Sequence, residues 1–398
     1  MTKSKLWTKE FIIITVTSFL VFLTFYLLMT TLTLYSIEQF HASETAAGFA
    51  ASIFVIGSLL LRIFSGKYVD VIGRKKLLYT SLILFLIACL LYFAVSNFNL
   101  LLLVRFIHGA AFGIATTVMA TAVMSIIPAE RRGEGTSYYS LSTPLATAIG
   151  PFLGIFITQH ADFDMIFAVC TLFSVISIVV MLFAKIPEAS LTKEQLQQAK
   201  GFNLQDFFEK SALPIASIIF ILGIAYASIL TYLSPYAIKI NLSGAASIFF
   251  IIYAVFLLGS RPFTGKLLDR KGDNIIVYPS LLFYTIGLVC LSQSYSNIML
   301  LVASAFIALG FGNMISCSQA VVVNKAPRHR IGLATSTFYI AMDAGVGVGP
   351  IIIGLILPIF GYRGMYMSMA AIVFVTIVIY YFVHGRKSKI MRQQASQA

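Results

Sequence analysis

The sequence predicts an all-α integral membrane protein whose twelve transmembrane helices form two equivalent halves. Hydrophobic residues make up 59% of its 398 positions and charged residues only 11%, whereas soluble domains carry about 25% charged residues. Apolar runs long enough to cross a bilayer recur along the chain. The phrase from Arg62 to Gly73 returns 199 positions later, from Arg261 to Gly272. A repeat of this length indicates that one half of the chain was built twice.

Each expected span is an apolar run that can cross a hydrocarbon core of about 30 Å at 1.5 Å per helical residue. The runs of the first half are residues 11 to 34, 46 to 65, 77 to 95, 98 to 126, 136 to 158 and 163 to 184. Those of the second half are residues 212 to 234, 243 to 260, 275 to 292, 297 to 323, 331 to 358 and 363 to 383. The expected domains are therefore a six-helix bundle of residues 1–184, a cytoplasmic linker of residues 185–211, a second six-helix bundle of residues 212–385 and a cytoplasmic tail of residues 386–398.

The basic residues predict the orientation of the chain. Of its 28 Lys and Arg residues, only Lys239 and Arg363 fall in segments on the side opposite the termini, and Arg105 falls inside a span. Because basic residues concentrate in cytoplasmic loops, both termini should be cytoplasmic, in a multi-pass protein of the cell membrane. This topology accounts for the net charge of +13, so we expect no nucleic-acid partner.

A charged loop with two glycines is expected between spans 2 and 3, and a degenerate copy between spans 8 and 9. The loop residues are Gly66, Asp70, Gly73, Arg74 and Lys75, and those of the copy are Gly265, Asp269 and Gly272. The glycines permit close approach or a positive φ, and Asp70 can accept a hydrogen bond from a helix N-terminus or pair with Arg74. Because the copy has Asp273 where the first loop has Arg74, we expect a cytoplasmic gate mainly in the first half. A simple topology anchor is the alternative.

Three titratable residues inside spans are candidates for proton coupling. Arg105 lies about 10 Å into span 4, and an intramembrane Arg is costly unless it faces a partner or water. His108 shares its helix face, although a packing histidine is the alternative. Asp343 lies about 18 Å into span 11, near the middle of the membrane. Its functional interpretation is a proton site, and its structural interpretation is a neutral Asp bonded to a neighbouring helix.

Span 5 carries small residues beside a proline. Gly150, Pro151 and Gly154 follow Ala146, and small residues four apart let two helices approach closely while the proline bends the span. Span 11 has its own version, from Gly345 to Gly354.

Together these motifs resemble the signatures of the major facilitator superfamily. The loop resembles G-x-x-x-D-x-x-G-R-K, span 4 resembles L-x-x-x-R-x-x-x-G, and span 5 resembles the antiporter motif g-x-x-x-G-P-x-x-G, with Ala146 in place of its first glycine. The resemblance covers about residues 10 to 385 and is closest to the twelve-span drug:proton antiporters. It implies two six-helix bundles related by a pseudo-twofold axis along the membrane normal, which rock about a central cleft. It also implies that Asp70 and Arg74 hold the cytoplasmic side closed in the outward-open state.

The resemblance further implies which spans line a substrate cavity. The polar and aromatic candidates in those spans are Tyr26, Thr30, Thr33, Tyr226, Tyr232, Asn313 and Gln319. Hydrogen bonding to the backbone is the alternative role for such residues in membrane helices.

The expected function is secondary active transport, namely proton-coupled efflux of small amphipathic molecules or drugs by alternating access. The expected partners are the small-molecule substrate, protons and the lipid bilayer, in a monomer. The proton gradient supplies the energy, and we expect no cofactor and no metal, since the four cysteines lack metal-ligand spacing. A dedicated exporter of a polar or anionic metabolite and a solute:proton symporter remain alternatives. A receptor or structural protein would need neither Arg105 nor Asp343. An enzyme is not expected, since no span holds a nucleophile, a base and an orienting group at workable spacing.

Overall fold

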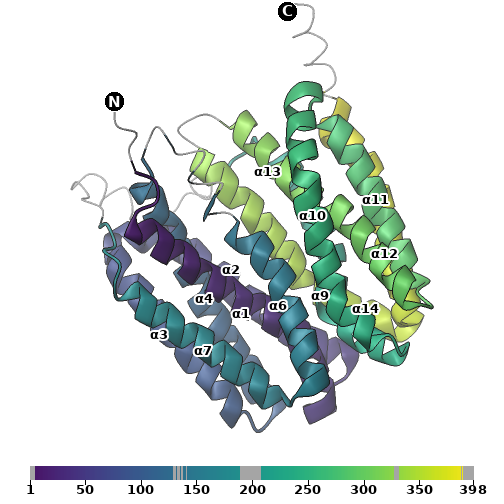
Figure 1. Cartoon of the computed structure of the whole chain (residues 1–398), viewed down its shortest axis with the longest axis horizontal. Coiled ribbons are helices and arrows are strands. Elements are labelled where there is room, and N and C mark those ends of the chain that lie inside the picture. Colours follow the sequence, from purple (N-terminus) through teal and green to yellow (C-terminus); the bar gives the residue numbers. More distant parts are fainter. Residues whose placement is uncertain are drawn as a thin grey trace, which may run out of the picture. The chain divides into compact units, whose positions relative to one another are not determined.

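The computed structural model describes residues 5–128, 131, 135, 138–139, 141–188, 208–326, 331–386 and 388, and every regular element within these ranges is a helix (Figure 1). The helices of the first half are α1 (Lys9–Phe40), α2 (Glu44–Ile72), α3 (Arg74–Leu91) with the 3₁₀ turn η1 (Tyr92–Ala94), α4 (Phe98–Ile126), α6 (Ser142–His160) and α7 (Phe163–Met181). Those of the second half are α9 (Leu213–Lys239), α10 (Ser243–Lys271), α11 (Asn274–Ser292), α12 (Asn297–Ile307), η4 (Ala308–Gly312), α13 (Asn313–Lys325), α14 (Ile331–Tyr380) and η6 (Tyr381–Gly385).

These elements supply the twelve predicted spans. Within the described residues, ten helical segments are long and apolar enough to cross a membrane. One of them, Leu333–Gly385, contains two spans, because Gly361 breaks α14 with a φ of 64° and a ψ of 178°. The remaining span is α6, which falls outside the ten. The prediction of an all-α membrane fold is confirmed.

The duplication is visible at the turns. Gly73 and Gly272, which are 199 positions apart, both have a positive φ, of 103° and 81°. Asn97 and Ser296 keep the same interval and cap α4 and α12 by accepting the backbone N–H of Leu100 and Met299, at 2.9 and 3.3 Å. A side-chain acceptor at this position satisfies one of the N–H groups that a helix start leaves without a partner.

One expectation about the repeated loop is wrong. Gly66 does not lie in a turn, because α2 continues to Ile72 and leaves Gly73 alone between α2 and α3. The second copy behaves in the same way, since α10 continues to Lys271 and Gly272 forms the turn. A single glycine in a positive-φ conformation is enough to reverse the chain.

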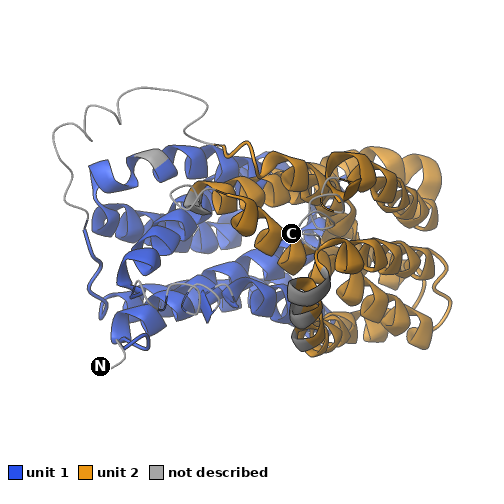
Figure 2. Ribbon diagram, turned by 90° about the horizontal axis from the view of Figure 1, so that it is seen from above, with its two compact units in different colours: residues 1–42, 53–202 blue, residues 43–52, 203–398 orange. Residues whose placement is uncertain are grey.

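Two compact units divide the chain, and Figure 2 colours them separately. Unit 1 comprises Met1–Ala42 and Ile53–Phe202. In it α1 packs against α4, α6 and α7, and α3 packs against α4 and α7. Its core includes a group of aromatic rings from three helices, in which Phe25 stacks on Phe54 at 5.1 Å and contacts Phe112 at 5.2 Å between centroids.

Unit 2 comprises Ser43–Ser52 and Asn203–Ala398, so it includes the start of α2. In it α9 packs against α14, and α11 packs against α12 and α14. The Tyr232 hydroxyl lies within hydrogen-bond reach of two carbonyl oxygens, that of Glu44 at 3.1 Å and that of Pro350 at 3.2 Å. Thr45 donates to the carbonyl of Gly354 at 2.5 Å. The expected linker lies mostly outside the described residues, which include only residues 185–188 and 208–211 of it.

Candidate functional site

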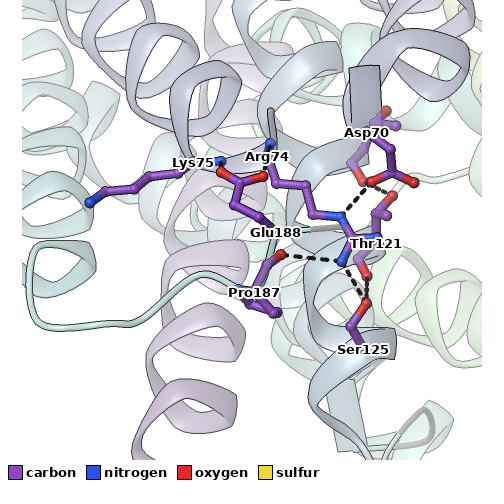
Figure 3. Close-up of polar contacts among 8 residues, drawn as sticks. Asp70, Arg74, Lys75, Thr121, Ser125, Pro187 and Glu188 are labelled. Atoms are coloured by element: carbon purple, nitrogen blue, oxygen red, sulfur yellow. Dashed lines mark hydrogen bonds and ion pairs between the residues drawn. The ribbon is translucent and has the colours of Figure 1, made fainter. Parts of the chain in front are cut away.

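Arg74 is the centre of the first-half loop (Figure 3). Its Nε donates to Asp70 at 2.6 Å, and its Nη1 donates to the Ser125 hydroxyl at 2.6 Å and to the Pro187 carbonyl at 3.3 Å. The residue is only 7% exposed although Asp70 is more open. Arg74 therefore joins the end of α2, the end of α4 and the segment after α7 through charge-assisted hydrogen bonds.

Glu188 completes this arrangement, and the sequence analysis missed it. Its two carboxylate oxygens accept the backbone N–H groups of Arg74 and Lys75, at 2.8 and 2.9 Å. Gly73 has no side chain with which to cap α3, so an acid 114 positions away supplies the cap. A carboxylate at a helix N-terminus also meets the positive end of the helix dipole. The only signal in the sequence is an acid next to Pro187 directly after an apolar run.

The second-half copy is described in part. Gly272 follows α10 directly and caps its end. Gly265 and Asp269 lie within α10, and the surroundings of these two residues lie outside the described part of the structure. In this copy, Asp273 occupies the position that Arg74 has in the first half. Asp273 precedes α11 and accepts the backbone N–H of Asn274 at 3.0 Å. The expectation that the gate lies mainly in the first half stays a prediction.

Arg105 and His108 are both fully buried in unit 1 and share one partner. The Arg105 guanidinium donates to the Tyr92 hydroxyl at 3.4 Å and lies 4.5 Å from the centroid of the Phe54 ring. His108 Nδ1 lies 3.1 Å from the same hydroxyl. The shared helix face expected for the two residues is therefore present, and Tyr92, at the start of η1, connects them.

The other nitrogen of His108 continues this network. His108 Nε2 lies 3.7 Å from the Cys89 thiol, which lies 3.3 Å from the Ser174 hydroxyl. Because Ser174 donates to the carbonyl of Cys170 at 2.8 Å, the chain of polar contacts runs from α4 through α3 to α7. Such a fully buried network fixes side-chain orientation strongly. Nothing in the sequence pattern indicated Tyr92, Cys89 or Ser174 as partners, since they come from other helices.

Asp343 lies in the first part of α14, in unit 2, and is half-buried. The adjacent backbone packs closely on α9. A methyl group added at Gly223 would meet the Met342 carbonyl oxygen at 3.0 Å, and one added at Gly345 would overlap the Phe220 carbonyl oxygen. Asp343 is therefore carried on a helix segment whose position is fixed by close contact with α9. Its assignment as a proton site stays a prediction.

The small residues of α6 face α1. A methyl group added at Gly150 would lie 2.8 Å from the Tyr26 Cβ, and one added at Gly154 would lie 2.8 Å from the Thr31 Cγ2. The equivalent helix of unit 2 repeats this contact, because a methyl group at Gly349 would lie 2.5 Å from the Ala227 Cβ of α9. Both Gly-Pro segments therefore permit close helix contact, as small residues do in membrane helices.

Most of the predicted cavity residues already have structural contacts. Thr30 donates to the Tyr26 carbonyl at 2.9 Å, and Asn313 donates to the Leu309 carbonyl at 2.9 Å and accepts from Ser260 at 3.0 Å. Tyr232 is bonded as described above. Only Gln319 of the seven is half-buried, and the others are buried. Thr30, Tyr232 and Asn313 thus bond to backbone carbonyl groups, and their contact with substrate stays a prediction.

Tyr226 and Thr33 differ from those three residues. The Tyr226 ring stacks on Phe311 at 4.0 Å between centroids. Phe311 belongs to η4, a π-helical turn, and such turns often occur at functional sites. The Thr33 hydroxyl is buried, and the described residues give it no hydrogen-bond partner. These two positions are the strongest remaining candidates for substrate contact. The described residues bring together no group of three or more His, Cys, Asp or Glu side chains that could hold a metal.

Comparison with known proteins identifies the fold. The chain is similar to the solved structure of a bacterial homolog of the human lysosomal transporter Spinster, with a TM-score of 0.77, 14% identity and 96% and 97% of the two chains covered. It is also similar to the nucleoside transporter NupG, with a TM-score of 0.71, 14% identity and 94% and 99% of the chains covered. At these identities the likeness shows the fold alone.

Relatives by sequence are transporters and exporters. An uncharacterized MFS-type transporter of Methanocaldococcus jannaschii is 25% identical over 353 residues, which are 86% of this chain and 90% of the relative. The staphylopine export protein of Staphylococcus aureus is 21% identical, covering 85% and 87%. The multidrug resistance protein MdtG of Yersinia enterocolitica is 29% identical over 41% of each chain. The sequence model described as Major Facilitator Superfamily matches residues 14–339 and 276–397. The chain therefore belongs to the Major Facilitator Superfamily and is a membrane transporter.

Proposed function

We propose that this transporter exports small amphipathic molecules in exchange for protons. The observation that carries the proposal is the position of Asp343, a half-buried carboxyl in the middle of a membrane-spanning segment of α14. An ionisable residue inside the membrane is costly to keep and usually marks an ion or substrate pathway. The similarity to a multidrug resistance protein supports drug-like substrates.

Asp343 binds a proton in one state of the transport cycle and releases it in the other. Arg105 fits a supporting role better than direct substrate binding, because it is fully buried against Tyr92 and Phe54. The loop around Arg74 closes the cytoplasmic side in the outward-open state. Both termini are in the cytoplasm. The protein acts as a monomer in the cell membrane. Neither a metal nor a cofactor takes part.

A second function has its own support. The staphylopine export protein matches 85% of this chain, whereas MdtG matches 41%. This extent of similarity favours a dedicated exporter of one metabolite over a polyspecific drug exporter. A substrate screen separates the two functions, because a polyspecific exporter lowers accumulation of several unrelated dyes and a dedicated exporter lowers that of one metabolite.

The coupling is tested in proteoliposomes with an imposed pH gradient. We expect Asp343→Asn to insert and fold, because the amide keeps the size of the carboxyl, and to lose proton-driven exchange by at least about tenfold while retaining substrate binding. The matched control is Asp162→Asn, which changes an acid directly before α7, outside the spans. Proton-driven exchange at the normal rate in Asp343→Asn would refute the assignment.

A further inference from the structure

Three elements of unit 2 meet at one histidine. His384 lies in η6 and is only 2% exposed. Its Nε2 is bonded to the carboxylate of Asp273, which precedes α11, and its Nδ1 lies 3.2 Å from the ammonium of Lys325, which ends α13. The imidazole therefore connects an acid and a base that come from two other helices.

The chemistry of the neighbours determines the state of the ring. An ammonium group has three donors and no acceptor, so a hydrogen bond from Lys325 requires a lone pair on Nδ1 of His384. The only proton of the ring is then on Nε2, from which it is donated to Asp273. In this structure His384 thus fits the neutral tautomer, inserted between a positive and a negative group.

We propose that His384 is a second proton-binding site of this transporter, at which proton binding expels Lys325 and frees the end of α13 from η6. A proton added at Nδ1 points an N–H bond at the Lys325 ammonium and replaces an attractive contact by the repulsion of two cations. The bond to Asp273 is strengthened at the same time, because the donor becomes charged. Protonation therefore keeps the contact between η6 and α11 and breaks the contact with α13.

The remaining groups around the ring do not titrate in its place. Burial acts to raise the pKa of the Asp273 carboxyl, but the hydrogen bonds from His384 and Ser388 outweigh burial and bring it to about 2. Asp273 therefore stays ionised at any pH the cytoplasm reaches. The Tyr380 ring lies 5.5 Å from the imidazole, and its hydroxyl donates to the side chain of Asn274. Near neutral pH imidazole is the side chain that ordinarily changes charge.

Among the described residues, the other charged and titratable groups near the ring are on α11, on α13 and directly after η6. Tyr278 of α11 packs against Tyr380, and Cys317 of α13 is close enough to Asp273 for electrostatic interaction. Arg386 follows η6 by one residue. Tyrosine and cysteine ordinarily keep their protons at neutral pH and arginine keeps its charge, so among the described groups around the ring His384 is the one that exchanges a proton.

The described residues of the first half contain no equivalent of this switch. At the same place in the repeat, Arg74 joins the corresponding elements with a guanidinium that stays charged at every pH compatible with folding. The two units therefore respond differently to cytoplasmic pH, although their helices and turns are duplicated. Residue Ile331, where α14 begins, follows α13 by only six positions, so freeing the end of α13 also frees the entry to the helix that carries Asp343.

The experiment measures the mobility of a spin label at the end of α13, in the absence of transport. A nitroxide label is attached at Asn324→Cys, an exposed position in the last turn of α13, in a Cys290→Ser background, since the other native cysteines are buried. The full-length protein is held in nanodiscs with no gradient and no substrate. Spectra are recorded between about pH 8 and pH 5.5, and we expect the immobile component of the spectrum to fall as the pH falls.

Three variants decide between outcomes. His384→Gln keeps a donor for Asp273 and an acceptor for Lys325, and should remain immobile at both pH values. In Lys325→Met the spin label should be mobile at both pH values, because the contact with His384 is absent. His160→Gln changes an exposed histidine at the end of α6, and should behave like the parent. A pH-dependent transition that persists in His384→Gln, or no transition in the parent, would overturn the proposal. Because the measurement needs no substrate, it can fail or succeed independently of the proposed export.

Discussion

Glu188 shows how one acid can stabilise a turn that the local sequence leaves incomplete. Its carboxylate accepts two backbone N–H groups at the start of α3, and Gly73 offers no side chain of its own. Loss of a helix N-cap typically costs about 1 kcal/mol. Because the same helix start carries Arg74, the cap also fixes the position from which Arg74 reaches Ser125.

We expect Glu188→Ala to increase hydrogen exchange in the first turn of α3 by about fivefold, which corresponds to about 1 kcal/mol of lost local stability. Glu188→Gln keeps one acceptor and should give a smaller increase. Asp164→Ala is the control, because it removes an acid from the first turn of α7 and should leave α3 unchanged. Equal exchange in Glu188→Ala and the parent protein would show that the cap is not stabilising.

The ionised form of Asp273 should stabilise the folded protein in a pH-dependent way. Its pKa is about 2 in the folded protein, below the value of 3.8 of an ordinary Asp. A lowered pKa contributes stability that is fully present above the unfolded value and is lost as the pH falls toward the folded value.

We therefore expect Asp273→Asn to lower the melting temperature at pH 7, and the difference from the parent to shrink only below about pH 4. Thermal unfolding in detergent between pH 7 and pH 3 measures this. A difference that is constant over the whole range would mean that the charge of Asp273 does not contribute.

At the scale of elements, close pairs of helices position the candidate residues. In unit 1 the small residues of α6 contact α1, and in unit 2 those of α14 contact α9. The sequence predicted close contact from the spacing of Gly150 and Gly154, but it could not name the partner helix. That information depends on packing between segments far apart in the chain, which the spacing of residues within one segment does not contain.

Substitutions of glycine should separate packing from helix propensity. Gly154→Ala adds a methyl group 2.8 Å from the Thr31 Cγ2, and overpacking of this kind typically costs about 1–3 kcal/mol. Gly259→Ala lies inside α10 with nothing within 4 Å, and should be neutral or stabilising by up to about 1 kcal/mol through helix propensity. The melting temperature should therefore fall in Gly154→Ala and stay the same or rise in Gly259→Ala. A stabilising Gly154→Ala would show that α6 and α1 separate easily.

At the scale of the whole molecule, the exchange proposed above predicts the direction of flux. In proteoliposomes, the substrate should move toward the more acidic compartment, because each proton that leaves that compartment is exchanged for substrate that enters it. Reversing the pH gradient should reverse the substrate flux, and a protonophore should abolish both. Substrate that moves in the same direction as the protons would identify a symporter instead.

The membrane-spanning helices could be predicted from the sequence more completely than the polar networks that join them. Residues 98–126 were expected as a span and form α4 with the same bounds, because hydropathy is a local signal. The contacts of Glu188 with Arg74 and of His384 with Asp273 join residues 114 and 111 positions apart. No local pattern specifies such pairs. Likewise, no sequence pattern indicated that Ser388, in the expected tail, donates to Asp273.

The start of α2 has a consequence for the synthesis of the protein. Glu44 is made 188 residues before Tyr232, and Thr45 is made 309 residues before Gly354. At about 5–20 residues per second, the ribosome needs roughly 10 to 40 s to reach the first partner and about 15 to 60 s to reach the second. During that time the first turns of α2 are inserted without the residues that hold them in unit 2, so their final position is set only after Gly354, near the end of the eleventh span, has been translated.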